Sequence, residues 1–310
     1  DSLTFDPKAL DEFDYLFAEL KKHGIYLCLD LYASREMRPG DNVKEREGRT
    51  FERYGFEMKS LIPLSKSAMA NWKEFARRLL THRNPYTGLT YAEDPALYSL
   101  NLVNENPLVI LWNLNSSLIP LFEEKYFEYL KKKRLDTPEN RASRSGLFIE
   151  FLNDLQIRSI EEQKRFLKDE LKLTALITDI NMTSKFTLNS AREHLDFVDN
   201  HQYWDHPRFP QKRWGIPFVF HNRSSISADA AAPRELMATR VFGKPFTVTE
   251  FNFCVPNIWR AECPTLFGGY AGLQDWDGLY RFAWSHGISG MKNTSRPLNH
   301  FDIVNNVQAQ

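Results

Sequence analysis

Six short apolar runs, most of them separated by helical patterns, constrain the fold of this 310-residue chain more than any other feature. The runs cover residues 25–31, 97–103, 173–182, 195–203, 246–251 and 280–285. Short continuous apolar runs predict strands that are buried on both faces. Strands that alternate with helices pair in parallel, because a right-handed crossover returns the chain to the same end of the sheet. The sequence therefore predicts an α/β protein, either an open doubly wound sheet or a (β/α) barrel.

Helical patterns fill most of the segments between these runs. Apolar residues recur at helical spacing after Asp6-Pro7, and Gly24 follows as a C-cap, which predicts a first helix between these points. A further helix is expected over residues 65–80. The stretch at about 112–171 exceeds an ordinary crossover, so we expect a helical insertion there, broken near residues 137–145. Its helices would pack over a cleft or form a subunit contact.

The polar residues gather at the carboxyl ends of the runs. They are Asp30, Asn104-Glu105, His201-Gln202-Tyr203, Glu250 and Trp284. Barrel enzymes carry their chemistry at this end of the strands. No Gly-x-Gly-x-x-Gly and no Walker loop follows a run, which argues against a nucleotide-binding open sheet. We see no internal repeat and no low-complexity linker, so the sequence favours one barrel domain over residues 1–310.

Charge and hydropathy exclude several classes of partner. The 40 Lys and Arg residues balance the 40 Asp and Glu residues, and no basic stripe suits a nucleic acid. The one basic run, residues 131–134, fits the solvated end of a helix. No apolar stretch approaches the ~20 residues of a membrane span. Aromatic residues make up 14% of the chain, which suits either a bulky core or a cleft that stacks sugar rings.

Cysteine and histidine residues give no sign of a metal site or a cofactor. Three cysteines are too few for a zinc ribbon or a disulfide framework. A disulfide between Cys254 and Cys263 remains open beside the alternative of two buried thiols. His201 and His206 lie five residues apart with no third ligand near them in the sequence. We therefore expect neither a metal nor an organic cofactor.

Glu105 and Glu250 are the strongest catalytic candidates, because each follows an apolar strand and burying an unpaired charge is costly. The alternative for each is a carboxylate that caps a helix or holds a loop. Strict alternation places Glu250 on the same face of its strand as Phe246 and Val248. Two carboxyl groups that face each other in a cleft are the machinery of glycoside hydrolysis.

Four segments resemble, in the correct order, motifs of the clan A glycoside hydrolases. They are Asn84-Pro85-Tyr86-Thr87-Gly88 continuing through Tyr91 and Asp94–Leu97 to Asn104-Glu105-Asn106-Pro107, then Asp199–Trp204, then Phe246–Phe251, and finally Phe282–Ser285. The sequence is most similar to the family 5 cellulases and mannanases, with the family 42 and family 35 β-galactosidases as relatives. The resemblance implies a (β/α)8 barrel of the TIM type.

The resemblance also implies roles for individual residues. Glu105 matches the acid/base, and Asn104 matches the residue that hydrogen-bonds the sugar 2-hydroxyl. Glu250 matches the nucleophile, and Tyr203 matches the tyrosine that hydrogen-bonds it. His201 matches a neighbour of that tyrosine in the cleft.

Three tryptophans complete the implied substrate site. Trp284 matches the aromatic platform under the sugar at the point of cleavage. Trp204 and Trp259 would help Tyr203 to shape the subsite. The alternatives for the matched aromatic and histidine side chains are ordinary core positions.

The sequence departs from the clan pattern in two places. Asn-Glu-Asn-Pro stands where Asn-Glu-Pro is usual. The chain is also expected to begin in the helix before the third strand and to end within the last helix, at 303–310. The first two strands, and the arginine that follows the second, would then be lacking. Six strands cannot close an eight-stranded barrel with ordinary tilt.

The function implied is that of a retaining β-glycosidase that hydrolyses β-linked glycosides or polysaccharides through two glutamates. The alternative is a catalytically inactive relative of the same barrel that binds carbohydrate. The sugar, the linkage, internal or terminal attack and the oligomeric state stay open. The compartment is also open, although enzymes that degrade carbohydrate are often secreted or periplasmic.

Overall fold

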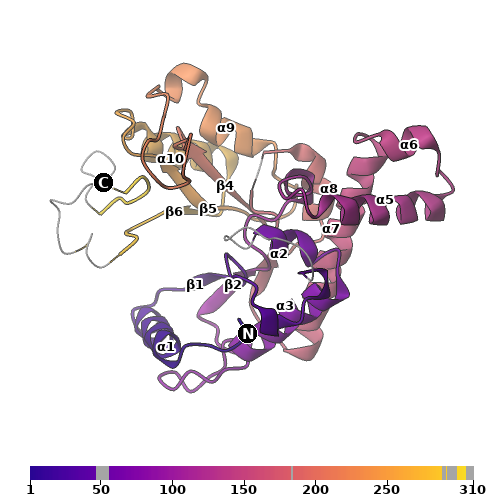
Figure 1. Ribbon diagram of the computed structural model, residues 1–310. Helices are drawn as coiled ribbons and strands as arrows, with labels where there is room; N and C mark the ends of the chain where they lie inside the picture. Colours follow the sequence, from indigo (N-terminus) through magenta and orange to yellow (C-terminus); the bar gives the residue numbers. More distant parts are fainter. Residues whose placement is uncertain (47–55, 183, 288–290, 292–298, 305–310) are drawn as a thin grey trace. The chain divides into compact units, whose positions relative to one another are not determined.

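The structure is a computed structural model that describes residues 1–46, 56–182, 184–287, 291 and 299–304 (Figure 1). The chain divides into two compact units. Unit 1 comprises residues 1–180 and 190–196, and unit 2 comprises residues 181–189 and 197–310. Residues 305–310 of the helix expected at the C-terminal end lie outside the described residues.

Unit 1 contains one parallel sheet and most of the helices. Its strands are β1 (Leu27–Asp30), β2 (Leu97–Asn101) and β3 (Leu176–Thr178). Its helices are α1 (Pro7–Lys22), η1 (Pro39–Asp41), η2 (Lys44–Arg46), α2 (Phe56–Leu61), α3 (Lys66–Leu80), α4 (Leu108–Leu111), α5 (Ile119–Lys133), α6 (Pro138–Ala142), α7 (Leu147–Arg165) and η3 (Phe166–Glu170).

The helix and strand boundaries of unit 1 follow from local chemistry. The Asp6 side chain accepts a hydrogen bond from the Ala9 amide, and Pro7 occupies the first turn of α1, as the sequence predicts. The Ser65 hydroxyl caps α3 in the same way. The strands are arranged in the order β1-β2-β3, and each pair is parallel. Trp72 of α3 is fully buried and donates to the carbonyl of Leu102, at the carboxyl end of β2.

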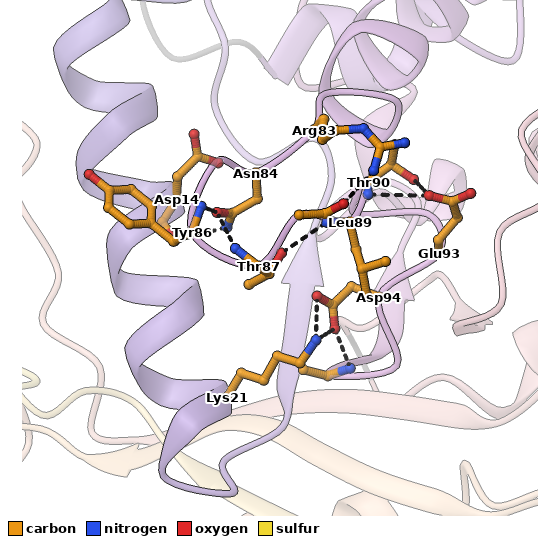
Figure 2. Close-up of polar contacts among 12 residues, drawn as sticks. Asp14, Lys21, Arg83, Asn84, Tyr86, Thr87, Leu89, Thr90, Glu93 and Asp94 are labelled. Atoms are coloured by element: carbon orange, nitrogen blue, oxygen red, sulfur yellow. Dashed lines mark hydrogen bonds and ion pairs between the residues drawn. The ribbon is translucent and has the colours of Figure 1, made fainter.

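The segment that begins at Asn84 has a structural role in unit 1 (Figure 2). The Asn84 side chain donates to the backbone carbonyl of Asp14 in α1 at 2.9 Å. The buried Asp94 carboxylate pairs with Lys21 of α1 at 2.8 Å and accepts from the Ala96 amide at 3.0 Å. These contacts join α1 to the amino end of β2. The first part of the motif therefore positions the strand.

Unit 2 contains the second parallel sheet, in the order β4-β5-β6. Its elements are η4 (Phe186–Leu188), β4 (Val198–Trp204), η5 (Ile226–Ala228), α9 (Ala231–Met237), β5 (Phe246–Phe253), α10 (Glu262–Gln274) and β6 (Gly278–Arg281). The short helix α8 (Asn189–Arg192) falls where the chain passes between the units. One face of the sheet packs in a core with side chains of α9 and α10, among them Leu236 and Phe267.

A β-bulge interrupts the alternation of β5. Val248 pairs with Asn200, whereas the next partner along β4, His201, pairs with Glu250, so Thr249 is an extra residue. The core contains Phe246 and Val248 before the bulge and Phe251 and Phe253 after it. The prediction that Glu250 shares a face with Phe246 and Val248 is therefore wrong, because one inserted residue inverts the side-chain parity of the rest of the strand.

We expect Phe251→Ala to destabilise unit 2 by about 3–5 kcal/mol, the usual cost of a large-to-small change in a core. Phe251 is 5% exposed and stacks on Phe267 with the ring centroids 4.3 Å apart. Phe242→Ala is the matched control, because that ring is fully exposed. Urea denaturation monitored by circular dichroism measures both. Equal stability of the two variants would contradict the bulged register.

The α/β class and the six parallel strands are confirmed for the described residues, but a closed barrel is not observed among them. The strands form two three-stranded sheets. The last strand is shorter than predicted and ends at Arg281, so Trp284 follows it in a loop. The helices α5, α6 and α7 occupy the segment where an insertion is expected. Within the described part of the chain, no helix combines the length and the apolar character that crossing a bilayer requires.

Candidate active site

Glu250 lies on the polar face of the sheet in unit 2, directly after the bulge. His201 on β4 pairs with Glu250, and Tyr203 lies two residues further along β4. The Tyr203 hydroxyl donates to Glu250 Oε2 at 2.5 Å. His201 Nδ1 lies 3.6 Å from Glu250 Oε1. Alternate residues of β4 share a face, so His201 and Tyr203 both approach the carboxylate from the neighbouring strand. The structure thus brings three of the residues predicted from sequence together.

The buried Asp199 carboxylate holds the bulge, a role that no sequence motif indicates. Its Oδ1 accepts from the Thr249 amide at 3.0 Å and from the Thr247 hydroxyl at 2.8 Å. The Thr249 hydroxyl also donates to Asp199 Oδ2 and lies 3.1 Å from His201 Nε2. A single carboxylate therefore fixes the residues on both sides of Val248. This contact sets the direction in which Glu250 leaves the strand.

Aromatic rings surround the Tyr203 side of the site. The Tyr203 ring contacts Phe301 at a centroid distance of 5.0 Å and Phe282 at 6.2 Å, both edge to face. The Asn252 amide donates to the carbonyls of Phe282 and Phe301 and so joins β5 to the segments that carry both rings. Sequence reasoning did not find Asn252, although its parity with Glu250 after the bulge is a usable signal.

The three predicted tryptophans occupy different surroundings. Trp204 is 7% exposed, belongs to the core and donates its indole N–H to the carbonyl of Arg223 at 2.8 Å. Its ring lies on the helix-covered face of the sheet, opposite to Glu250, so we leave Trp204 out of the proposed site. Trp259 and Trp284 are 44% and 58% exposed, in loops that follow β5 and β6. Both have surface available for a ligand.

In unit 1, Glu105 stands in a tight turn beyond the carboxyl end of β2. Its backbone φ is +52°, in the left-handed region that non-glycine residues seldom adopt. The backbone N–H of the preceding Asn104 donates to the backbone carbonyl of Tyr32, beyond β1, at 2.8 Å. Both side chains are partly exposed. The turn therefore presents a carboxyl group and an amide at the end of the sheet, where the sequence predicts them.

A buried carboxyl group lies under this turn. Asp179 follows β3, is 1% exposed and accepts hydrogen bonds from the Val103 amide and the Asn106 side chain. Burial raises its pKa to about 7, and the hydrogen bonds from Asn106, Val103 and Gln156 oppose that shift. In the sequence, neither the spacing of Asp179 nor its neighbours mark it as a functional residue.

Comparison with known proteins gives independent evidence about the fold. No family model matches the sequence, and no curated sequence matches it. An endo-beta-1,4-mannanase from Thermotoga petrophila is similar in structure, with a TM-score of 0.60, 14% identity and 96% of this chain covered. The chain spans 59% of that protein's length.

A Glycoside Hydrolase Family 5 mannosidase from Rhizomucor miehei gives a TM-score of 0.54 at 12% identity, over 97% of this chain and 69% of that one. An endo-1,4-beta-mannanase from the same organism gives 0.52 at 15%, over 88% and 67%. The chain is similar in fold to family 5 glycoside hydrolases. The resemblance inferred from the sequence motifs is thereby confirmed at the level of the fold.

Proposed function

We propose that this chain acts as a retaining β-glycosidase on β-linked glycosides or polysaccharides. The observation that carries the proposal is the hydrogen bond from Tyr203 to Glu250 at 2.5 Å, at a bulge that aims Glu250 away from the core. A short hydrogen bond from a phenol orients a carboxylate for nucleophilic attack. The family 5 fold supports the same reaction class.

In the proposed reaction Glu250 attacks the anomeric carbon and forms a covalent glycosyl ester. Glu105 donates its proton to the departing glycosidic oxygen, so that the carbon–oxygen bond breaks without release of an alkoxide. Glu105 then takes a proton from water as the water oxygen attacks the ester carbon. This releases the sugar with its original configuration and regenerates both carboxyl groups. The mechanism requires that the two carboxyl groups come within about 5–5.5 Å of each other.

The remaining residues would bind and orient the sugar. Asn104 would hydrogen-bond the 2-hydroxyl, a contact that strengthens in the transition state. Trp284 and Trp259 are the exposed rings that could stack on the C–H-rich face of a pyranose. Neighbours named as mannanases make β-1,4-linked mannan the first substrate to try.

Proton NMR of the first product tests the proposal. The wild-type protein is mixed with β-1,4-mannan, with a β-1,4-glucan and with aryl β-glycosides, and spectra are recorded before mutarotation. We expect the β-anomer to appear first. An α-anomer as the first product would contradict a double displacement, and glycan binding without any product would identify the inactive carbohydrate-binding relative instead.

A further inference from the structure

The side chain of Asp179 connects the two ends of the turn that carries Glu105. Asp179 Oδ1 accepts from the Val103 amide at 3.2 Å, and both of its oxygens lie 3.0 Å from Asn106 Nδ2. Val103 precedes the Asn104-Glu105 pair and Asn106 follows it. One carboxyl group thus fixes both flanks of the pair without touching either member in the contacts described.

The Asn106 side chain is held at its other end as well. Its Oδ1 accepts from the Ile180 amide at 3.2 Å, so donor and acceptor of the same amide are both bound to the segment that follows β3. Rotation of this amide would break hydrogen bonds on both sides. The orientation of Asn106, and with it the backbone after Glu105, is therefore fixed relative to β3.

The helix α7 contributes the last contact of the network. Gln156 Nε2 donates to Asp179 Oδ2 at 3.1 Å, and Gln156 Oε1 accepts from the Leu108 amide at 3.2 Å. All of these groups are buried. A polar network that is satisfied in this way is rigid, because each lost contact leaves a buried polar group without a partner.

A turn with a left-handed residue needs such a frame. The φ of +52° at Glu105 is a conformation that persists only where the surroundings enforce it. A buried carboxyl group is a poor way to stabilise a core, because the charged form is costly to bury. Asp179 instead fixes the local geometry of the turn, through Val103 and Asn106.

We propose that Asp179 is the positioning residue for Glu105, which it holds indirectly through Val103 and Asn106 in the orientation needed for proton transfer. The inference rests on the proposed function of Glu105 as the acid/base. It deepens that function by assigning the task of orientation to a residue on a neighbouring strand end. General acid catalysis depends on the position of the proton within a fraction of an ångström, so loss of the frame should reduce it.

Leaving-group dependence separates positioning of the acid from a general loss of structure. A glycoside with a poor leaving group, such as an alkyl glycoside or an oligosaccharide, needs the acid to break its bond. A dinitrophenyl glycoside departs without protonation. In Asp179→Asn, an NH2 group in the place of Oδ2 faces the donors of Asn106 and Gln156, so half of the acceptor capacity is lost.

We expect Asp179→Asn to lower kcat/KM for the poor leaving group by about 10- to 100-fold, the usual cost of a misplacement near 1 Å. The value for the dinitrophenyl glycoside should change by less than about threefold. Asp196→Asn is the matched control, because Asp196 also holds β3, but through the amide of its central residue Ile177, at 2.8 Å. In this control, any loss of kcat/KM relative to the wild type should be the same for the two substrates. Gln156→Met removes the donor to Asp179 and the acceptor of the Leu108 amide but keeps the Asp179 carboxyl group. It should show the same selectivity with a smaller loss, and it serves if Asp179→Asn does not fold.

Several outcomes would overturn the inference. Equal losses for the two substrates in Asp179→Asn and Gln156→Met, or the same selectivity in Asp196→Asn, would reduce Asp179 to a structural residue. Glu105→Gln shows which proposal has failed. Selective loss in Glu105→Gln with none in the Asp179 and Gln156 variants overturns the positioning role alone. A wild-type protein that hydrolyses neither substrate overturns the proposed function and this inference together.

Discussion

Glu250→Ala will lower turnover of a dinitrophenyl β-glycoside by about 10⁴- to 10⁶-fold, as expected when a covalent nucleophile is removed. The loss follows from the proposed mechanism, because no other group would form the glycosyl ester. Tyr203 would keep its place in this variant, held by the Phe301 and Phe282 rings, so the change would be confined to the missing carboxylate. Stopped assays with high-performance chromatography measure the residual rate.

Azide gives this prediction its sharpest form. A small anion can enter the space left by the Glu250 side chain and attack the anomeric carbon from the side that the carboxylate used. The product would then be a glycosyl azide of inverted, α configuration, and it would not be processed further. Glu235→Ala is the matched control, because Glu235 is an exposed carboxylate of α9 that hydrogen-bonds Gln202 on the opposite face of the sheet. Activity close to that of the wild type in Glu250→Ala would refute the assignment.

Glu105→Ala should show the complementary pattern. Hydrolysis of glycosides with poor leaving groups is expected to fall by about 10²- to 10⁴-fold, the usual contribution of a general acid or base. A dinitrophenyl glycoside should still form the ester on Glu250, and the ester should then accumulate because no base activates water. A burst of dinitrophenol measured by stopped-flow absorbance would report this.

The two azide products distinguish the roles of the two glutamates. In Glu105→Ala, azide attacks the ester from the side of the departed leaving group, so the product would be a β-glycosyl azide. Glu93→Ala provides a control in unit 1, because Glu93 is exposed and accepts hydrogen bonds from Thr90 within its own turn (Figure 2). An α-azide from Glu105→Ala would mean that the roles of the two glutamates are reversed.

The regular parts of the fold could be predicted because their signals are local. The cap at Asp6, the proline after it and the apolar spacing of α1 lie within a few turns of one another. The positions of β1, β2, β4 and β5 follow from short apolar runs. The end of β6 was missed because residues 282–284 are also apolar, and nothing in their order shows that the chain leaves the sheet at Arg281.

The candidate site could be predicted from the sequence only where polar residues close an apolar run. Glu105, His201, Tyr203 and Glu250 stand at the carboxyl ends of such runs, although the structure places the last three inside β4 and β5. The face of Glu250 was misjudged, although the spacing of apolar residues in β5 marks the bulge. Neighbouring apolar positions lie two residues apart, except that Val248 and Phe251 lie three residues apart. Asp179 could not be found, because the groups that it joins lie 73 to 76 residues away in the sequence, and such pairing appears only on folding.

The bulge in β5 also defines how this strand can be redesigned. In a regular strand, every second side chain points to the same face of the sheet, so only half of the residues can line a binding surface on that face. Around Thr249 the rule changes, since Thr249 and Glu250 are consecutive and both contact polar groups of β4. Thr247 and Asn252 share this face, but both are buried and hydrogen-bonded to neighbouring segments, so a library directed at substrate preference should keep them. Core-facing apolar residues have to occupy even-numbered positions before Thr249 and odd-numbered positions after it.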